Sequence, residues 1–84
     1  MSKKEKLIKR LLSRPKDFTF DELATLMGLL GFRLDTGGKT SGSRVIFRHD
    51  RHLPVEIHRP HPANVLKLYQ VRQIIQELTE GDLL

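Results

Sequence analysis

Two neighbouring runs of alternating residues, 44–48 and 53–58, constrain the fold more than any other part of this sequence. Apolar and polar side chains alternate in both runs, which is the period-2 pattern of strands with one buried face. Because apolar residues must face each other across a hairpin, Arg44 lies opposite either His58 or Glu56. The side chains expected to face the core are Val45, Phe47, Leu53, Val55 and Ile57.

Helical patterns flank this hairpin on both sides. Residues 3–14 carry an apolar stripe that is typical of a short amphipathic helix. Thr19 and Glu22 have the spacing of a capping box, which predicts a second helix that continues to a C-terminal cap at Gly31. Residues 67–79 repeat apolar side chains with helical spacing and predict the last helix.

With a further short strand at residues 32–35, the predicted order of elements is α-α-β-β-β-α. This is an α+β fold, a three-stranded antiparallel sheet with helices packed on one face. We expect a single domain over residues 1–84, with an N-terminal helical extension at 1–16 ahead of a core at 19–80. The other sheet face, left open or available to a partner, is expected to carry Arg33, Arg44, Arg48 and His58.

Charge limits the classes of partner. Lysine and arginine outnumber aspartate and glutamate by 15 to 10, and the net charge of +5 favours polyanionic partners such as nucleic acid, although acidic proteins also bind basic domains. The absence of cysteine excludes disulfides and thiolate metal sites. No apolar run is long enough for a signal peptide or a membrane span, so we expect a cytoplasmic protein.

All four histidines lie between residues 49 and 61. We interpret His49 and His52, which flank the expected hairpin turn, as solvated loop residues, and we expect no metal site because no third ligand accompanies either histidine pair. His58 ends a strand on the polar face, and a histidine can accept or donate a proton near neutral pH. Such a histidine beside an arginine suffices to cleave RNA through its own 2′-hydroxyl. The alternative is a strand histidine that only hydrogen-bonds a phosphate or a carboxylate.

Several cations are expected on the strands and loops of the same face, where they can contact phosphates with little sequence preference. Like charges repel one another unless an anion is present, which argues against a purely solvated face. These cations are Arg33, Lys39, Arg44, Arg48, Arg51 and Arg59.

Four short motifs follow one another along the chain: Gly31-Phe32 at a helix end, Gly42-Ser43 before a strand, Ile57-His58-Arg59-Pro60-His61-Pro62 at a strand exit, and Leu68-Tyr69-Gln70-Val71-Arg72-Gln73-Ile74-Ile75 in the last helix. In this order they resemble the HicA toxins over roughly residues 23–78. The resemblance implies a fold similar to double-stranded RNA-binding domains, an RNA-cleaving activity that stops translation, and a HicB-like antitoxin that covers the active face. It implies no cofactor.

One position departs from the family pattern. The pattern is Gly-Ser-His, in which the resemblance implies a catalytic histidine, whereas this chain has Arg44 after the Gly-Ser pair. Arginine stays protonated near neutral pH and cannot act as a general base there. Three possibilities stay open: His58 has taken over proton transfer, the domain binds RNA without cutting it, or the motif aligns differently in this strand.

From this resemblance we expect an endoribonuclease, an mRNA interferase toxin, in which His58 acts as base or acid while Arg44 and Arg48 stabilise the phosphate. The alternative is a non-catalytic RNA-binding or protein-interaction domain of the same fold. The expected partners are mRNA and a HicB-like antitoxin, with no membrane and no small-molecule cofactor. The other expected RNA-binding residues are Arg33, Lys39, Ser43 and Arg59.

Overall fold

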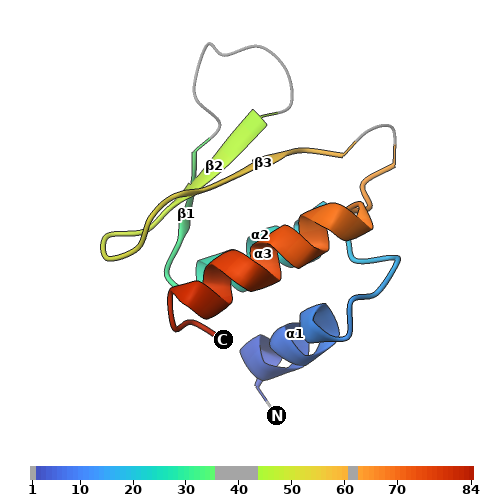
Figure 1. Cartoon of the computed structure of the whole chain (residues 1–84), viewed down its shortest axis with the longest axis horizontal. Helices are drawn as coiled ribbons and strands as arrows, with labels where there is room; N and C mark the ends of the chain where they lie inside the picture. Colours follow the sequence, from blue (N-terminus) through green and yellow to red (C-terminus); the bar gives the residue numbers. More distant parts are fainter. Residues whose placement is uncertain (1, 36–43, 61–62) are drawn as a thin grey trace.

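The computed structural model describes residues 2–35, 44–60 and 63–84. The predicted α+β order and the three-stranded antiparallel sheet are confirmed, and the strands follow the order β1-β2-β3 in the sheet (Figure 1). The elements are α1 (Lys3–Leu12), α2 (Phe20–Leu29), β1 (Arg33–Asp35), β2 (Arg44–Arg48), β3 (Val55–His58) and α3 (Leu68–Glu80).

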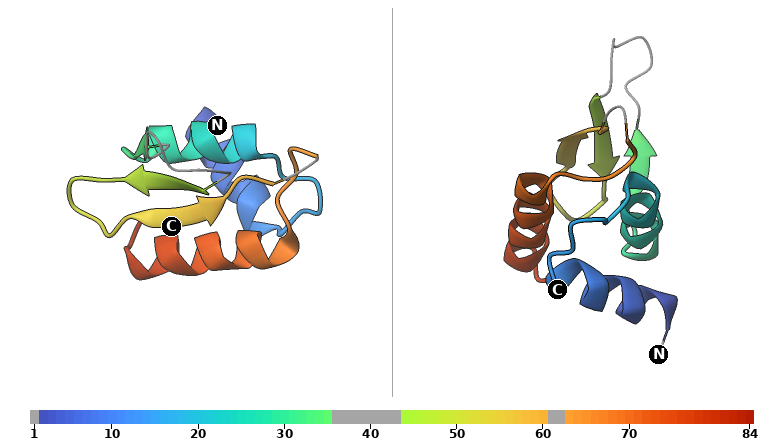
Figure 2. Two further views of the ribbon diagram at one scale, coloured as in Figure 1. Left: turned by 90° about the horizontal axis from the view of Figure 1, so that it is seen from above. Right: turned by 90° about the vertical axis from the view of Figure 1, so that its right-hand side faces the viewer.

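The elements form three layers. Helices α2 and α3 lie side by side beneath one face of the sheet, and α1 packs against both of them on the side away from the sheet (Figure 2). None of the described elements covers the outer face of the sheet. No described helix is long and apolar enough to cross a membrane.

The hydrophobic core lies between the sheet and the two helices beneath it, and Leu11 of α1 also reaches it. Phe47 pairs with Val55 and Arg44 with His58, which confirms the first of the two possible registers. Leu53 was expected to face the core, but this prediction is wrong, since its side chain is 86% exposed. The strand β3 begins only at Val55, so the turn carries Leu53 away from the core.

The ends of α2 follow the predicted signals. Thr19 and Glu22 form a complete capping box, in which the Thr19 hydroxyl accepts from the Glu22 N–H at 3.1 Å. After the helix, Gly31 has a φ of +98°, and the Phe32 N–H donates to the Met27 carbonyl at 2.9 Å. This geometry closes the helix and turns the chain directly into β1.

The segments that precede α2 and α3 are paired. The Leu66 N–H donates to the Phe18 carbonyl at 2.8 Å, and the Phe20 N–H donates to the Asn64 carbonyl at 3.0 Å. These two bonds hold the beginnings of α2 and α3 together under the end of the sheet where β3 finishes.

Candidate nucleic-acid interface

The outer face of the sheet carries the polar side chains that alternate with the core residues. The register places Arg44 directly opposite His58 and Arg33 directly opposite Arg48. All four side chains are exposed. Directly opposite residues have Cβ atoms about 4.5–5.5 Å apart, so the structure brings Arg44 beside His58 and Arg33 beside Arg48, and the two pairs stand at opposite ends of β2.

Each of the three arginines on this face lies near a carboxylate. The pairs are Arg48 Nε with Asp35 Oδ2 at 2.7 Å, Arg33 Nη1 with Asp50 Oδ1 at 3.1 Å, and Arg44 Nε with Glu56 Oε2 at 3.8 Å. Repulsion between these cations therefore does not argue against a solvated face, because the strands and the turn supply the anions that balance them. Exposed ion pairs contribute only about 0–1 kcal/mol, so a phosphate can compete with these carboxylates.

Glu56 lies at the centre of this arrangement. It stands opposite Ile46 and two residues before His58 on β3, so its side chain shares the outer face with Arg44 and His58. The longest of the three arginine–carboxylate distances joins Glu56 to Arg44. Arg44 is therefore the least tightly paired of these arginines.

A buried amide holds the end of β3 in place. Gln70 is 5% exposed, and it is the one buried polar side chain among the described residues. Its Nε2 donates to the backbone carbonyl of His58 at 2.9 Å, and its Oε1 accepts from the Lys67 N–H at 2.9 Å. Gln70 was not among the predicted site residues. The signal that could have indicated it is its position four residues before Ile74, which places a polar side chain on the buried stripe of α3.

Arg59 does not join the outer face. Its guanidinium lies over the ring of Phe20 in α2, 4.8 Å from the ring centroid, and therefore on the helix side of the sheet. The Arg59 Nε is buried and has no hydrogen-bond partner within the described residues. Lys39 and Ser43, which were also predicted to bind RNA, lie outside the described residues.

The turn histidines have structural contacts, so their interpretation as solvated loop residues is wrong. His49 is half-buried, and its Nδ1 accepts from the Arg51 N–H at 3.0 Å while its Nε2–H donates to the Leu30 carbonyl at 3.2 Å. Its ring meets the rings of Phe32 and His52 edge-on, with centroids 4.8 and 4.6 Å away. No group of three potential metal ligands occurs in the described part of the chain.

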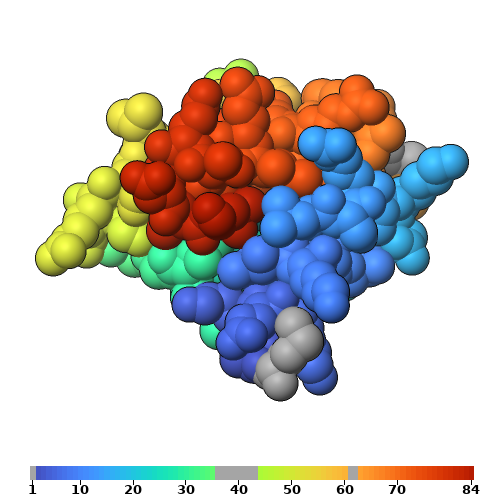
Figure 3. All heavy atoms as spheres, turned by 60° about the horizontal axis from the view of Figure 1, so that its bottom comes forward, coloured from blue at the N-terminus to red at the C-terminus, as the bar shows by residue number. Residues whose placement is uncertain are grey.

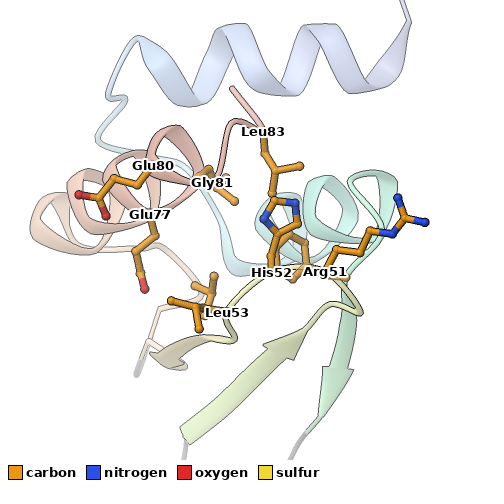
Figure 4. A pocket seen from close by; sticks show the side chains of 10 residues that line it. Arg51, His52, Leu53, Glu77, Glu80, Gly81 and Leu83 are labelled. Carbon is orange, nitrogen blue, oxygen red and sulfur yellow. The ribbon is translucent and has the colours of Figure 1, made fainter.

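A separate hollow of about 340 Å³ lies between the hairpin turn and the C-terminal end of α3 (Figure 4). It reaches the beginning of β3 at Val55, whereas His58 stands at the other end of that strand. Its lining mixes apolar side chains with charges of both signs, including Phe32, Arg51, His52, Leu53, Glu77 and Leu83. This hollow is therefore not part of the outer sheet face.

The fold and the face together define a small α+β domain whose charged sheet surface is open to a partner. The family model described as the HicA toxin of bacterial toxin–antitoxin systems matches residues 20–79, from the first residue of α2 almost to the end of α3. This chain belongs to the HicA toxin family. Helix α1 precedes the matched residues. Comparisons with curated proteins and with solved structures gave no match.

Proposed function

We propose that this toxin binds mRNA on the outer face of its sheet and cleaves it there, which blocks translation. The observation that carries the proposal is the cross-strand pair of Arg44 and His58, both exposed on a face that no described element covers. The pair places a group that can transfer protons near neutral pH beside a permanent cation. These two functions suffice for RNA cleavage, because RNA supplies its own nucleophile, the 2′-hydroxyl.

In the proposed reaction, His58 takes the proton from a 2′-hydroxyl and the 2′-oxygen attacks the adjacent phosphorus. The bond from phosphorus to the 5′-oxygen breaks, and that oxygen takes a proton from solvent. The products are a 2′,3′-cyclic phosphate and a 5′-hydroxyl. Arg44 and Arg48 stabilise the charge on the phosphate oxygens, and, as the resemblance to the family implies, the reaction uses no metal or cofactor.

Arg44 becomes available when a phosphate replaces Glu56 as its partner. The two side chains are about half exposed and their atoms are 3.8 Å apart, so the pair is easily exchanged. Arg33 positions the RNA strand together with Lys39 and Ser43, two residues that lie outside the described part of the chain. We further propose that a HicB-like antitoxin covers this face in the cytoplasm and competes for the same arginines.

Induced expression tests the enzymatic function. We expect the wild-type chain to arrest growth and to cleave purified mRNA, and we expect His58→Ala to relieve the arrest while the purified variant still binds RNA. Arg72→Gln, which changes an exposed cation on α3, is the control and should arrest growth like wild type. A His58→Ala variant that arrests growth and cleaves RNA at the wild-type rate would remove His58 from the mechanism.

The alternative is a non-catalytic RNA-binding or protein-interaction domain. It is favoured by Arg44 itself, because this arginine occupies the position where the family pattern implies the catalytic histidine. A wild-type chain that is harmless when expressed, leaves mRNA intact and still binds it would establish this second function.

A further inference from the structure

The excess positive charge of this chain lies in the α1 segment, residues 1–19, and not in the part that forms the sheet. The α1 segment contains seven lysines and arginines against two acidic residues, whereas residues 20–84 contain eight of each. The net charge of +5 therefore comes entirely from the segment that precedes the family match. The part of the chain that carries the proposed active site has no net charge.

Helix α1 is fixed to the rest of the molecule by one face. Leu11 is fully buried, and Leu7 and Ile8 pack against the core from α1. Arg10 adds a polar attachment, since its Nε donates to a carboxylate oxygen of Glu22 at 2.7 Å. The orientation of α1 is thus set, and Arg10 is not free to bind a ligand.

The other face of α1 presents a stripe of lysines. Lys3, Lys6 and Lys9 follow each other at intervals of three residues, so they lie on one side of the helix over about 9 Å of its length. All three are exposed, and none forms an ion pair with any carboxylate of the described residues. Figure 3 shows α1, in dark blue, at the surface of the molecule.

We propose that this lysine stripe is a second contact surface, which binds the sugar-phosphate backbone of RNA. Unpaired ammonium groups bind phosphates by releasing counterions, without any preference for base sequence. Helix α1 and the sheet lie on opposite sides of the α2–α3 layer (Figure 2), so the stripe on α1 contacts a part of the RNA remote from the RNA strand at His58. The choice of RNA among polyanions rests on the proposed function, whereas the existence of a polyanion site does not.

An anionic membrane fits this surface less well. An interfacial helix buries its apolar face in the lipid headgroup region. The apolar face of α1 is already used, because Leu7, Ile8 and Leu11 pack against the core of the protein.

A matched pair of triple variants tests the stripe. Lys3→Gln/Lys6→Gln/Lys9→Gln removes the stripe, and Lys16→Gln/Lys67→Gln/Arg72→Gln removes the same charge from exposed cations outside the stripe. The measurement is fluorescence anisotropy with a labelled single-stranded RNA of about 30 nucleotides, at salt concentrations from roughly 50 to 200 mM. We expect the stripe variant to bind RNA on the order of tenfold more weakly. The slope of log affinity against log salt concentration should become shallower by about 2, because each lost phosphate contact contributes about 0.7. The control should lose much less.

The proposal would be overturned by a stripe variant with the wild-type affinity and salt slope, or by a control that loses as much as the stripe variant. Vesicles of phosphatidylserine and phosphatidylcholine test the membrane alternative, and lysine-dependent vesicle binding together with unchanged RNA binding would also overturn it. Circular dichroism melts should show that both variants fold.

The proposed function can fail separately. If wild type binds RNA through the stripe but does not cleave it, the catalytic proposal fails while the second surface stands. If wild type cleaves RNA and the stripe variant binds as wild type does, the second surface fails and the catalytic proposal stands.

Discussion

The outer sheet face and the exposed face of α1 are both rich in cations, but their charges are organised differently. The arginines Arg33, Arg44 and Arg48 stand on strands and each forms an ion pair with a carboxylate, whereas the lysines of α1 form no ion pair with the described residues. Paired arginines have restricted positions and produce a weak long-range field. Unpaired lysines produce a strong field with little geometric control. The first arrangement suits chemistry at one phosphate, and the second suits attraction to many.

The two regions are also attached to the helices in different ways. The end of β3 is held by the buried amide of Gln70, and α1 is held in part by Arg10, whose side chain is 35% exposed where it meets Glu22. Losing a buried hydrogen-bond partner costs more than losing an exposed ion pair. The sheet face should therefore be the more sensitive of the two regions to a single substitution.

The strongest test of the sheet face is Arg44→Gln. Because removing one group that stabilises transition-state charge costs about 10²–10³ in rate, we expect a loss of that size in single-turnover cleavage of RNA. RNA affinity should fall far less, because the variant loses a single phosphate contact, which contributes about 0.7 to the slope of log affinity against log salt concentration. Arg72→Gln on α3 is the control, and equal cleavage by the two variants would show that Arg44 has no catalytic part.

Replacing Gln70 tests how the sheet face is held. Gln70→Leu leaves the His58 carbonyl and the Lys67 N–H without their partner, which should lower the free energy of unfolding by about 1–3 kcal/mol. Urea unfolding measures this loss. Gln73→Leu on the exposed side of α3 is the control, and the idea fails if both variants lose the same stability.

Removing a built-in counter-charge should make the sheet face behave more like α1. We expect Glu56→Gln to raise RNA affinity about fivefold at 0.1 M salt, because Arg44 then has no carboxylate partner to exchange for a phosphate. Glu80→Gln makes the same change in net charge on α3. A titration in which both variants bind equally would mean that the net charge matters and the pairing does not.

Acid should weaken the attachment of α1. The hydrogen bond from Arg10 lowers the pKa of Glu22 below its usual value of 4.5. A lowered pKa in the folded state means that this stabilisation is present above pH 4.5 and is lost as the pH falls through the lowered pKa. We expect a small effect, in which Glu22→Gln melts at a lower temperature than wild type at neutral pH and loses less stability than wild type below pH 4.5. Asp21→Asn is the control in thermal melts, and it should follow the wild-type pH dependence.

Much of the fold could be predicted from short stretches of sequence. Thr19 with Glu22 and then Gly31 marked the ends of α2, since caps depend on residues a few positions apart. The alternation around Val45 and Val55 limited the hairpin to two registers, one of which is observed. Leu53 was misplaced because alternation continues through the turn, and a pattern does not indicate where a strand begins.

The candidate site was less predictable. The alternation left Arg44 opposite either His58 or Glu56, and the structure selects His58, but no pattern indicated the roles of Gln70 and His49. Their partners lie 12 and 19 residues away along the chain, so only packing decides whether they meet. The net charge correctly indicated a basic protein, yet it did not indicate which surface carries the excess.

By itself, the sequence determined the order of helices and strands, the caps and the alternating faces of the hairpin, because each of these depends on neighbouring residues. Only the tertiary structure decided which carboxylate stands beside each sheet arginine and which cations stay unpaired on α1. The reason is physical: an ion pair depends on distances between side chains from separate elements, and those distances exist only after the elements have packed.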